Sequence, residues 1–171
     1  MWERTITIDS TGKTFSLTGW KIGWALGPAE LVGQIQAAHQ FITFASGTPF
    51  QDALATAMEL SRENGYYDQL VRDYTHRKKL LETALAGAEL TTLPIGGSYF
   101  LMADISGLGF DTDVAFCEWL VESIGVAAVP PSAFYLEPGT APLLARFCFA
   151  KSDATIAAAA ERLRNIGPVE P

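Results

Sequence analysis

Residues 9–23 carry the side chains of this chain that are best suited to chemistry. Ser10 and Lys13 place a hydroxyl and an amine three residues apart, and Lys21 adds a second amine eight residues further on. An amine can form a Schiff base with an aldehyde cofactor. A second cation, a hydroxyl and backbone amides can hold a phosphate group. The segment is therefore compatible with a site for a phosphate-bearing aldehyde.

Two short motifs in the same segment are typical of other enzymes. Residues 12–14 (GKT) match the end of a nucleotide-binding P-loop, but Thr7 stands where that motif needs its first glycine. Residues 10–13 (STGK) match the S-x-x-K of serine acyl-enzymes, but the chain has no K-T-G or S-D-N element. An ordinary surface loop with a solvated lysine is a further alternative for so short a motif.

The composition excludes several classes of protein. The chain has 171 residues, of which 49% are hydrophobic and 18% charged, against about 25% charged in typical domains, so we expect a packed core rather than disorder. The net charge is −7, with no basic stripe, which argues against nucleic-acid binding. No apolar run reaches the ~18 residues that a membrane span needs. The N-terminus shows no signal-peptide pattern, so we expect a cytoplasmic protein.

The cysteines and histidines do not form a metal-binding pattern. Cys117 and Cys148 lie in apolar stretches, which predicts buried free thiols in a reducing compartment. No Cys/His spacing fits a zinc site, so no metal is expected.

The elements that must position the lysines alternate between strands and helices, which predicts an α/β fold. Residues 9–19 are expected to form a loop, and proline at position 28 opens a helix. The expected strands are residues 4–8, 22–26, 90–93, 99–103, 126–129 and 146–149. The expected helices are residues 28–43, 50–62, 66–86, 111–123 and 152–165.

The pattern also predicts two domains. Residues 62–171 read as a small α/β domain. Residues 1–61 contain only two strands, which are too few for an independent sheet, so we expect them to be the C-terminal remainder of a larger domain. The high apolar fraction indicates surface that faces another domain or a partner chain.

Residues 10–23 strongly resemble the lysine signature of class I/II, fold-type I pyridoxal-phosphate aminotransferases. The resemblance continues in the same order through residues 27–28, 44–55, 96–100, 130–135 and 146–149. The nearest subgroups are the kynurenine/glutamine/methionine and the N-succinyldiaminopimelate aminotransferases. The resemblance implies the end of the large domain plus the small domain, pyridoxal 5′-phosphate as cofactor, amino acid and 2-oxo acid substrates, and a homodimer.

The resemblance also implies residue roles. Lys13 matches the lysine that forms the Schiff base and then moves the proton of the substrate. Ser10 and Lys21 match phosphate-binding positions. Lys21 departs from the arginine that is commoner in the family, but the kynurenine-type subgroup also has lysine at that position. Arg146 matches the arginine that pairs with the substrate α-carboxylate. Phe44 matches a position that often reaches the active site of the neighbouring subunit, with a core aromatic as the alternative.

The physical chemistry of arginine supports the role of Arg146. A planar guanidinium can bind a carboxylate through two hydrogen bonds while it stays charged. An arginine within an apolar strand is costly unless a partner is supplied. Tyr99 and Phe134 are expected to be packing residues.

Three readings of activity stay open. The family chain is more than twice this long, and its residues for the pyridine nitrogen, the cofactor hydroxyl and ring stacking have no counterpart here. Asp9 adds a negative charge near the phosphate site. The chain is therefore expected to belong to an aminotransferase, to be an inactive truncated domain that only folds and associates, or to belong to a β-lyase of the same fold.

Overall fold

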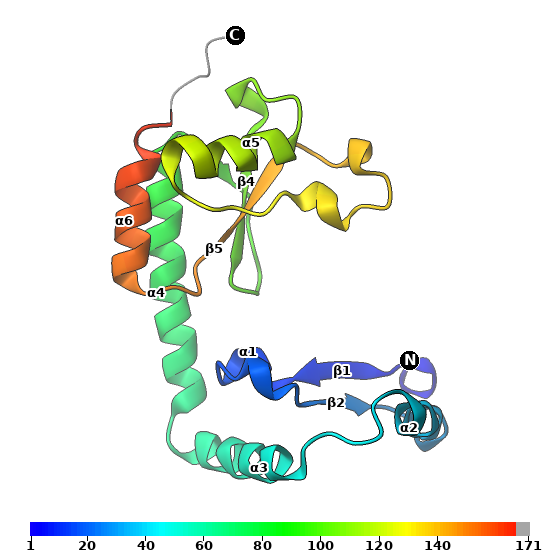
Figure 1. The fold of residues 1–171 in the computed structure, drawn as a ribbon. Helices are drawn as coiled ribbons and strands as arrows, with labels where there is room; N and C mark the ends of the chain where they lie inside the picture. Colours follow the sequence, from blue (N-terminus) through cyan, green and yellow to red (C-terminus); the bar gives the residue numbers. More distant parts are fainter. Residues whose placement is uncertain (167–171) are drawn as a thin grey trace. The chain divides into compact units, whose positions relative to one another are not determined.

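The computed structural model describes residues 1–166, with the side chain of Pro138 left aside. It divides into two compact units, Met1–Tyr67 and a second unit that begins at Asp68 (Figure 1). The expected α/β fold is confirmed. In the described part of the chain, no helix is long and apolar enough to cross a membrane.

The first unit contains a two-stranded antiparallel sheet and helices. Strands β1 and β2 pair from Thr7↔Leu26 to Ser10↔Gly23. The elements, in order, are η1 (Trp2–Arg4), β1 (Thr7–Ser10), α1 (Thr11–Thr14), η2 (Thr18–Trp20), β2 (Gly23–Leu26), α2 (Ala29–Ile42), α3 (Thr48–Glu63) and the start of α4 (Tyr66–Ala86).

The first strand differs from its expected position. Residues 2–4 form a 3₁₀ turn, and the strand runs from Thr7 to Ser10. The expected loop at residues 9–19 contains α1, a helix of four residues. The helices that follow agree with the sequence: Pro28 caps α2, and a proline lies in the first turn of α3, where its fixed φ favours helix initiation.

The second unit is built on a three-stranded antiparallel sheet in the order β3-β4-β5. The predicted strand at residues 126–129 is wrong, because it contributes only an isolated bridge between Val129 and Arg146. The elements after α4 are β3 (Thr91–Thr92), β4 (Phe100–Asp104), η3 (Ser106–Leu108), α5 (Asp113–Trp119), a π turn η4 (Leu120–Ile124), η5 (Pro131–Phe134), η6 (Pro138–Thr140), β5 (Leu144–Cys148) and α6 (Asp153–Leu163).

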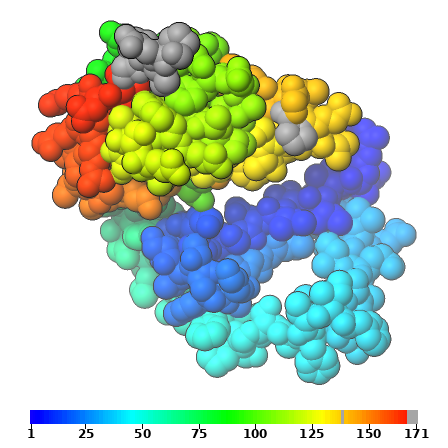
Figure 2. All heavy atoms as spheres, turned by 45° about the horizontal axis from the view of Figure 1, so that its top comes forward, coloured from blue at the N-terminus to red at the C-terminus, as the bar shows by residue number. Residues whose placement is uncertain are grey.

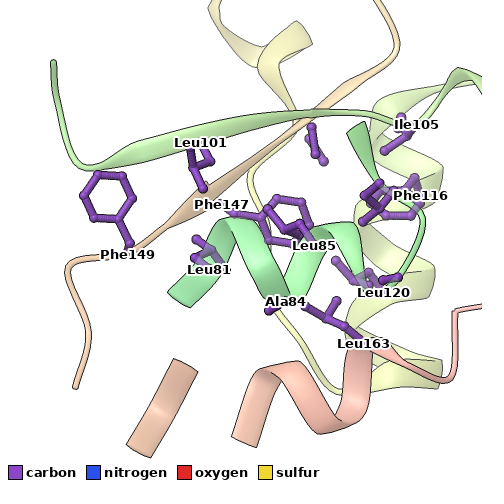
Figure 3. Close-up of a cluster of buried hydrophobic side chains, with 14 of the residues drawn as sticks. Leu81, Ala84, Leu85, Leu101, Ile105, Phe116, Leu120, Phe147, Phe149 and Leu163 are labelled. Carbon is purple, nitrogen blue, oxygen red and sulfur yellow. The ribbon is translucent and has the colours of Figure 1, made fainter. Parts of the chain in front are cut away.

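The core of the second unit lies on one face of this sheet. Burial alternates along β4 and β5, as the two-residue period of a strand requires. One face is covered by α4 and α5, and α6 packs alongside α4 (Figure 3). The other face carries Phe100, Met102 and Arg146, which are only half-buried. The fully covered side chains include Leu85, Leu101, Phe116, Leu120, Phe147 and Leu163.

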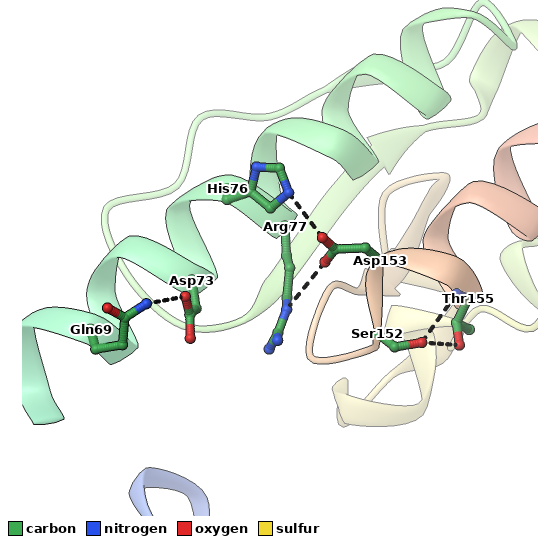
Figure 4. A network of polar contacts seen from close by, with 7 residues as sticks. All are labelled: Gln69, Asp73, His76, Arg77, Ser152, Asp153 and Thr155. Carbon is green, nitrogen blue, oxygen red and sulfur yellow. Dashed lines mark hydrogen bonds and ion pairs between the residues drawn. The ribbon is translucent and has the colours of Figure 1, made fainter.

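Polar contacts on the surface join α4 to the start of α6 (Figure 4). Asp153 lies 3.1 Å from Nε2 of His76 and 3.6 Å from Nε of Arg77. Ser152 caps α6 by accepting a hydrogen bond from the backbone N–H of Thr155. These ion pairs are exposed and so contribute little to stability.

Candidate active site

Lys13 lies on α1, directly after β1. The start of α1 is tied to the start of β2 through Thr11, which is 2% exposed. Its hydroxyl and its backbone N–H both donate to the carbonyl of Ile22, at 3.0 and 3.1 Å. A buried hydroxyl with a satisfied hydrogen bond is a stable anchor. The backbone that carries the lysine is therefore fixed to both strands.

The other end of α1 is held by Tyr66. The Tyr66 hydroxyl donates to the carbonyl of Thr14 at 2.6 Å. The ring of Tyr66 stacks on that of Phe15, with centroids 5.3 Å apart and planes within 10°. Such stacking adds to the stability given by burial. Both ends of the lysine helix are thus anchored within the first unit.

Ser10, Lys13 and Lys21 come together around one pocket of about 590 Å³, here called the lysine pocket. Among the described residues, neither lysine amino group takes part in a hydrogen bond or an ion pair. Two free cations are therefore available to an anionic ligand. The remaining lining residues are Ile8, Asp9, Gly12, Thr18, Ile22, Gly23, Trp24, Ala25 and Ile35.

The backbone around the lysine pocket is unusually close-packed. A Cβ added at Gly23 would lie 2.6 Å from the carbonyl oxygen of Asp9, so only glycine fits there. Lys21 has φ +55°, a left-handed conformation that non-glycine residues seldom adopt. The Asp9 carboxylate accepts a hydrogen bond from the backbone N–H of Ser10 at 2.6 Å. A strained backbone conformation such as that of Lys21 is typical of functional sites.

Phe44 lies just after α2 and is not a core residue, since its side chain is 78% exposed. The core-aromatic alternative is therefore wrong. Phe44 lines a second pocket of about 430 Å³ that shares Gly23, Ala25 and Ile35 with the lysine pocket. Phe44 is thus next to the lysine pocket and not within it.

Arg146 lies on the half-buried face of the sheet in the second unit. Its guanidinium carbon lies 4.2 Å from the ring centroid of Phe100 and 4.8 Å from that of Phe134. Its Nε is buried and has no hydrogen-bond partner among the described residues. Among the described residues, two aromatic rings thus lie against the guanidinium, while its buried Nε keeps no acceptor.

The expectation that Phe134 is a packing residue is wrong, because its side chain is 65% exposed and contacts Arg146. A second feature that the sequence did not reveal is a buried hydrogen bond. The Asp113 carboxylate accepts from the backbone N–H of Ser132 at 2.7 Å, and both residues are less than 7% exposed. In the sequence, Asp113 is only one acidic residue at the start of a helix.

The fold and these residues define the class of protein. The family model described as Aminotransferase class I and II matches residues 2–163. The chain therefore belongs to the class I and II aminotransferases, as the resemblance implied, and members of this class depend on pyridoxal phosphate.

Two relatives illustrate this membership. The methionine aminotransferase of Escherichia coli is 42% identical over 164 residues, which cover 96% of this chain and 42% of that protein. A probable N-succinyldiaminopimelate aminotransferase of Mycobacterium tuberculosis is 41% identical over 172 residues, covering 95% of this chain and 43% of that protein. The chain thus spans about 42% of the length of the relatives that it matches.

Solved structures agree with the sequence matches. The Escherichia coli methionine aminotransferase superposes with a TM-score of 0.88, covering 95% of this chain and 42% of that one. A putative kynurenine aminotransferase from Saccharomyces cerevisiae, 31% identical, gives a TM-score of 0.91 over 96% of this chain and 43% of that one. The fold is therefore that of the corresponding part of fold-type I aminotransferases.

Proposed function

We propose that this chain supplies the lysine, the phosphate-binding residues and the carboxylate-binding arginine of a pyridoxal-phosphate-dependent aminotransferase. Such an enzyme moves the amino group of an amino acid to a 2-oxo acid. The observation that carries the proposal is the lysine pocket, where Lys13, Ser10 and Lys21 meet beside an anchored helix. The chemistry of these side chains fits an aldehyde that carries a phosphate.

Lys13 has two tasks in this proposal. Its amine would hold an aldehyde cofactor covalently. As a free amine, Lys13 would accept the proton from the substrate α-carbon and then donate a proton back. A bound pyridoxal ring would supply an electron sink for the charge left at the α-carbon. The fixed position of α1 keeps the amine oriented for both tasks.

Ser10 and Lys21 hold the phosphate group. The Ser10 hydroxyl donates a hydrogen bond, and the Lys21 ammonium acts as a point charge that offsets the anion. The carboxylate of Asp9 is turned to the backbone N–H of Ser10.

Arg146 binds the α-carboxylate of the substrate. Its guanidinium has no acceptor within residues 1–166, and its Nε is buried. A buried donor without a partner is costly, and a carboxylate would satisfy it through a charge-assisted hydrogen bond. The orphaned Nε therefore fits a site for a carboxylate ligand.

The proposal also covers the domain division, the subunit arrangement and the location of the protein. We propose that residues 1–61 belong to the large domain and residues 62–171 to the small domain. We also propose a cytoplasmic homodimer in which Phe44 approaches the site of the second subunit. The exposure of Phe44 supports this role.

The experiment that tests the proposal is a titration of the full 171-residue chain with pyridoxal 5′-phosphate, followed by borohydride reduction and peptide mass mapping. We expect a Schiff-base absorption band and a label on Lys13, both absent in Lys13→Ala. Lys21→Ala should weaken binding about tenfold, as the loss of one charge-assisted contact predicts.

The matched control is Lys79→Ala, which removes an exposed lysine of α4 and should leave the label unchanged. A label scattered over surface lysines would contradict the cofactor assignment and favour the alternative of a domain that only folds and associates. If Lys13 takes the label, an assay of amino transfer with the unreduced chain then distinguishes an aminotransferase from a β-lyase, which releases ammonia.

A further inference from the structure

Two aromatic side chains that the proposed function does not use lie against the guanidinium of Arg146. We propose that Phe100 and Phe134 form an aromatic clamp that holds the Arg146 guanidinium ready for a carboxylate, and that Asp113 is a positioning residue that keeps Phe134 in this clamp. The inference rests on the proposed role of Arg146 and extends it to three further residues.

Phe100 is the fixed half of the clamp. Met102 pairs with Arg146 and Phe100 pairs with Cys148, so Phe100 is a diagonal neighbour of Arg146 on the same face of the sheet. Its ring centroid lies 4.2 Å from the guanidinium carbon. The pairing of β4 with β5 therefore sets this contact.

Phe134 is the half of the clamp that comes from outside the sheet. It ends η5, within a segment that lies on the surface of the second unit and is yellow to orange in Figure 2. Its ring centroid lies 4.8 Å from the guanidinium carbon. The ring of Phe100 also contacts that of Tyr99, at 4.4 Å between ring centroids.

The clamp stabilises the charge of Arg146 without using its donors. The face of an aromatic ring attracts a cation within about 6 Å, but it does not compete as a carboxylate would for the N–H groups. A carboxylate neighbour would instead neutralise the arginine and block its hydrogen bonds. The guanidinium is thus oriented in advance, which lowers the entropy cost of binding a ligand.

Two contacts fasten the segment that carries Phe134. Val129 and Arg146 exchange backbone hydrogen bonds, both at 3.0 Å. Three residues further on, the buried carboxylate of Asp113 accepts the backbone N–H of Ser132 at 2.7 Å. Hydrogen bonds to a charged acceptor are the stronger kind. Removal of the Asp113 acceptor should therefore free η5 and let Phe134 leave the guanidinium.

The test follows the Nε–H resonance of Arg146 by NMR in the full chain without cofactor, during a titration with butyrate. Ring currents from the clamp should shift this resonance in the free protein, and butyrate should move it further. Phe134→Leu should reduce the ring-current shift and weaken butyrate binding about threefold to tenfold, the range that one partly desolvated cation–π contact implies. Phe134→Tyr keeps an aromatic face and should restore both.

Asp113→Ala should reproduce the effect of Phe134→Leu although the ring of Phe134 is still present. The double variant that combines the two substitutions should lose no more butyrate affinity than either single variant. Asp113→Asn keeps an oxygen acceptor and should bind nearly as the wild type does. Asp113→Ser replaces Asp113→Ala if that variant does not fold. The matched control is Leu136→Ala in the same segment, whose side chain is fully exposed.

The outcomes separate this inference from the proposed function. If Arg146→Gln abolishes binding while Phe134→Leu binds as the wild type does, the clamp is overturned and the carboxylate role of Arg146 stands. If folded Asp113→Ala and Asp113→Ser keep the wild-type shift and affinity, the positioning role of Asp113 is overturned. If Arg146→Gln binds butyrate with the wild-type affinity, or if butyrate does not shift the Nε–H resonance of the wild type, both the carboxylate role and the clamp are overturned.

Discussion

At the scale of single residues, Asp113 affects a second neighbour besides Ser132. Burial, together with the negative charge of Asp113 as a smaller cause, raises the pKa of the Cys117 thiol to about 11. Cys117 is a free thiol that packs in the core of the second unit. A thiol that keeps its proton at neutral pH is a poor nucleophile, which agrees with the place of Cys117 in the packed core.

This pKa predicts how stability depends on pH. The folded thiol has a pKa of about 11 and the ordinary value is 9.0, so the unfolded chain loses this proton first. The stabilising contribution is complete below pH 9 and is lost as the pH rises from 9 to about 11. Urea unfolding at pH 8.5 and pH 10.5 should show the wild type losing more stability than Cys117→Ala, which cannot titrate. An equal loss in both proteins would refute the prediction.

At the scale of elements, the pairing of β1 with β2 shapes the lysine pocket. Ser10 of β1 stands opposite Gly23 of β2, and the two strands approach so closely there that a Cβ at Gly23 would meet the backbone of Asp9. The place where α1 leaves the sheet is therefore set by one glycine. A change at that position should affect both the stability of the first unit and the phosphate-binding residues.

We expect Gly23→Ala to destabilise the chain by about 1–3 kcal/mol, the cost of overpacking a close contact, and to weaken pyridoxal-phosphate binding. Urea unfolding and the cofactor titration measure the two effects. The matched control is Gly19→Ala, because a Cβ at Gly19 meets no atom within 4 Å. If both variants behave alike, the close approach of β1 and β2 does not shape the lysine pocket.

At the scale of the whole molecule, the two units differ in how much apolar surface they bury. Within Met1–Tyr67, the buried hydrophobic residues are Ile22 and Leu54, whereas the second unit has a continuous core. The end of α2 exposes Phe41 by 87% and Ile42 by 78%. Exposed apolar residues in such number are typical of surfaces that bind another protein surface.

We therefore expect the chain to self-associate in solution. Lysine substitutions at Phe41 and Ile42 together should shift sedimentation-velocity profiles toward the monomer, because charge opposes burial in an interface. The matched control is Val71→Lys, since Val71 is 65% exposed on α4 of the second unit. A wild-type chain that sediments as a single monomer over a wide concentration range would contradict this expectation.

Local patterns predicted the long helices well and the short elements poorly. The predicted helix at residues 66–86 is confirmed to the residue, because a helical period repeats many times over that length. The four residues of α1 are too few to show any period. The apolar run at residues 126–129 satisfies the pattern of a strand, but in the fold only Val129 finds a strand partner.

The sequence by itself determined the family, the α/β class and the candidate residues Lys13, Ser10, Lys21 and Arg146, because a signature of neighbouring residues needs no knowledge of the fold. Only the tertiary structure decided that Phe134 contacts Arg146 and that Asp113 holds Ser132, which is 19 residues away along the chain. The path of the intervening chain brings these partners together. That path depends on the packing of α5 and β5, which no local pattern specifies.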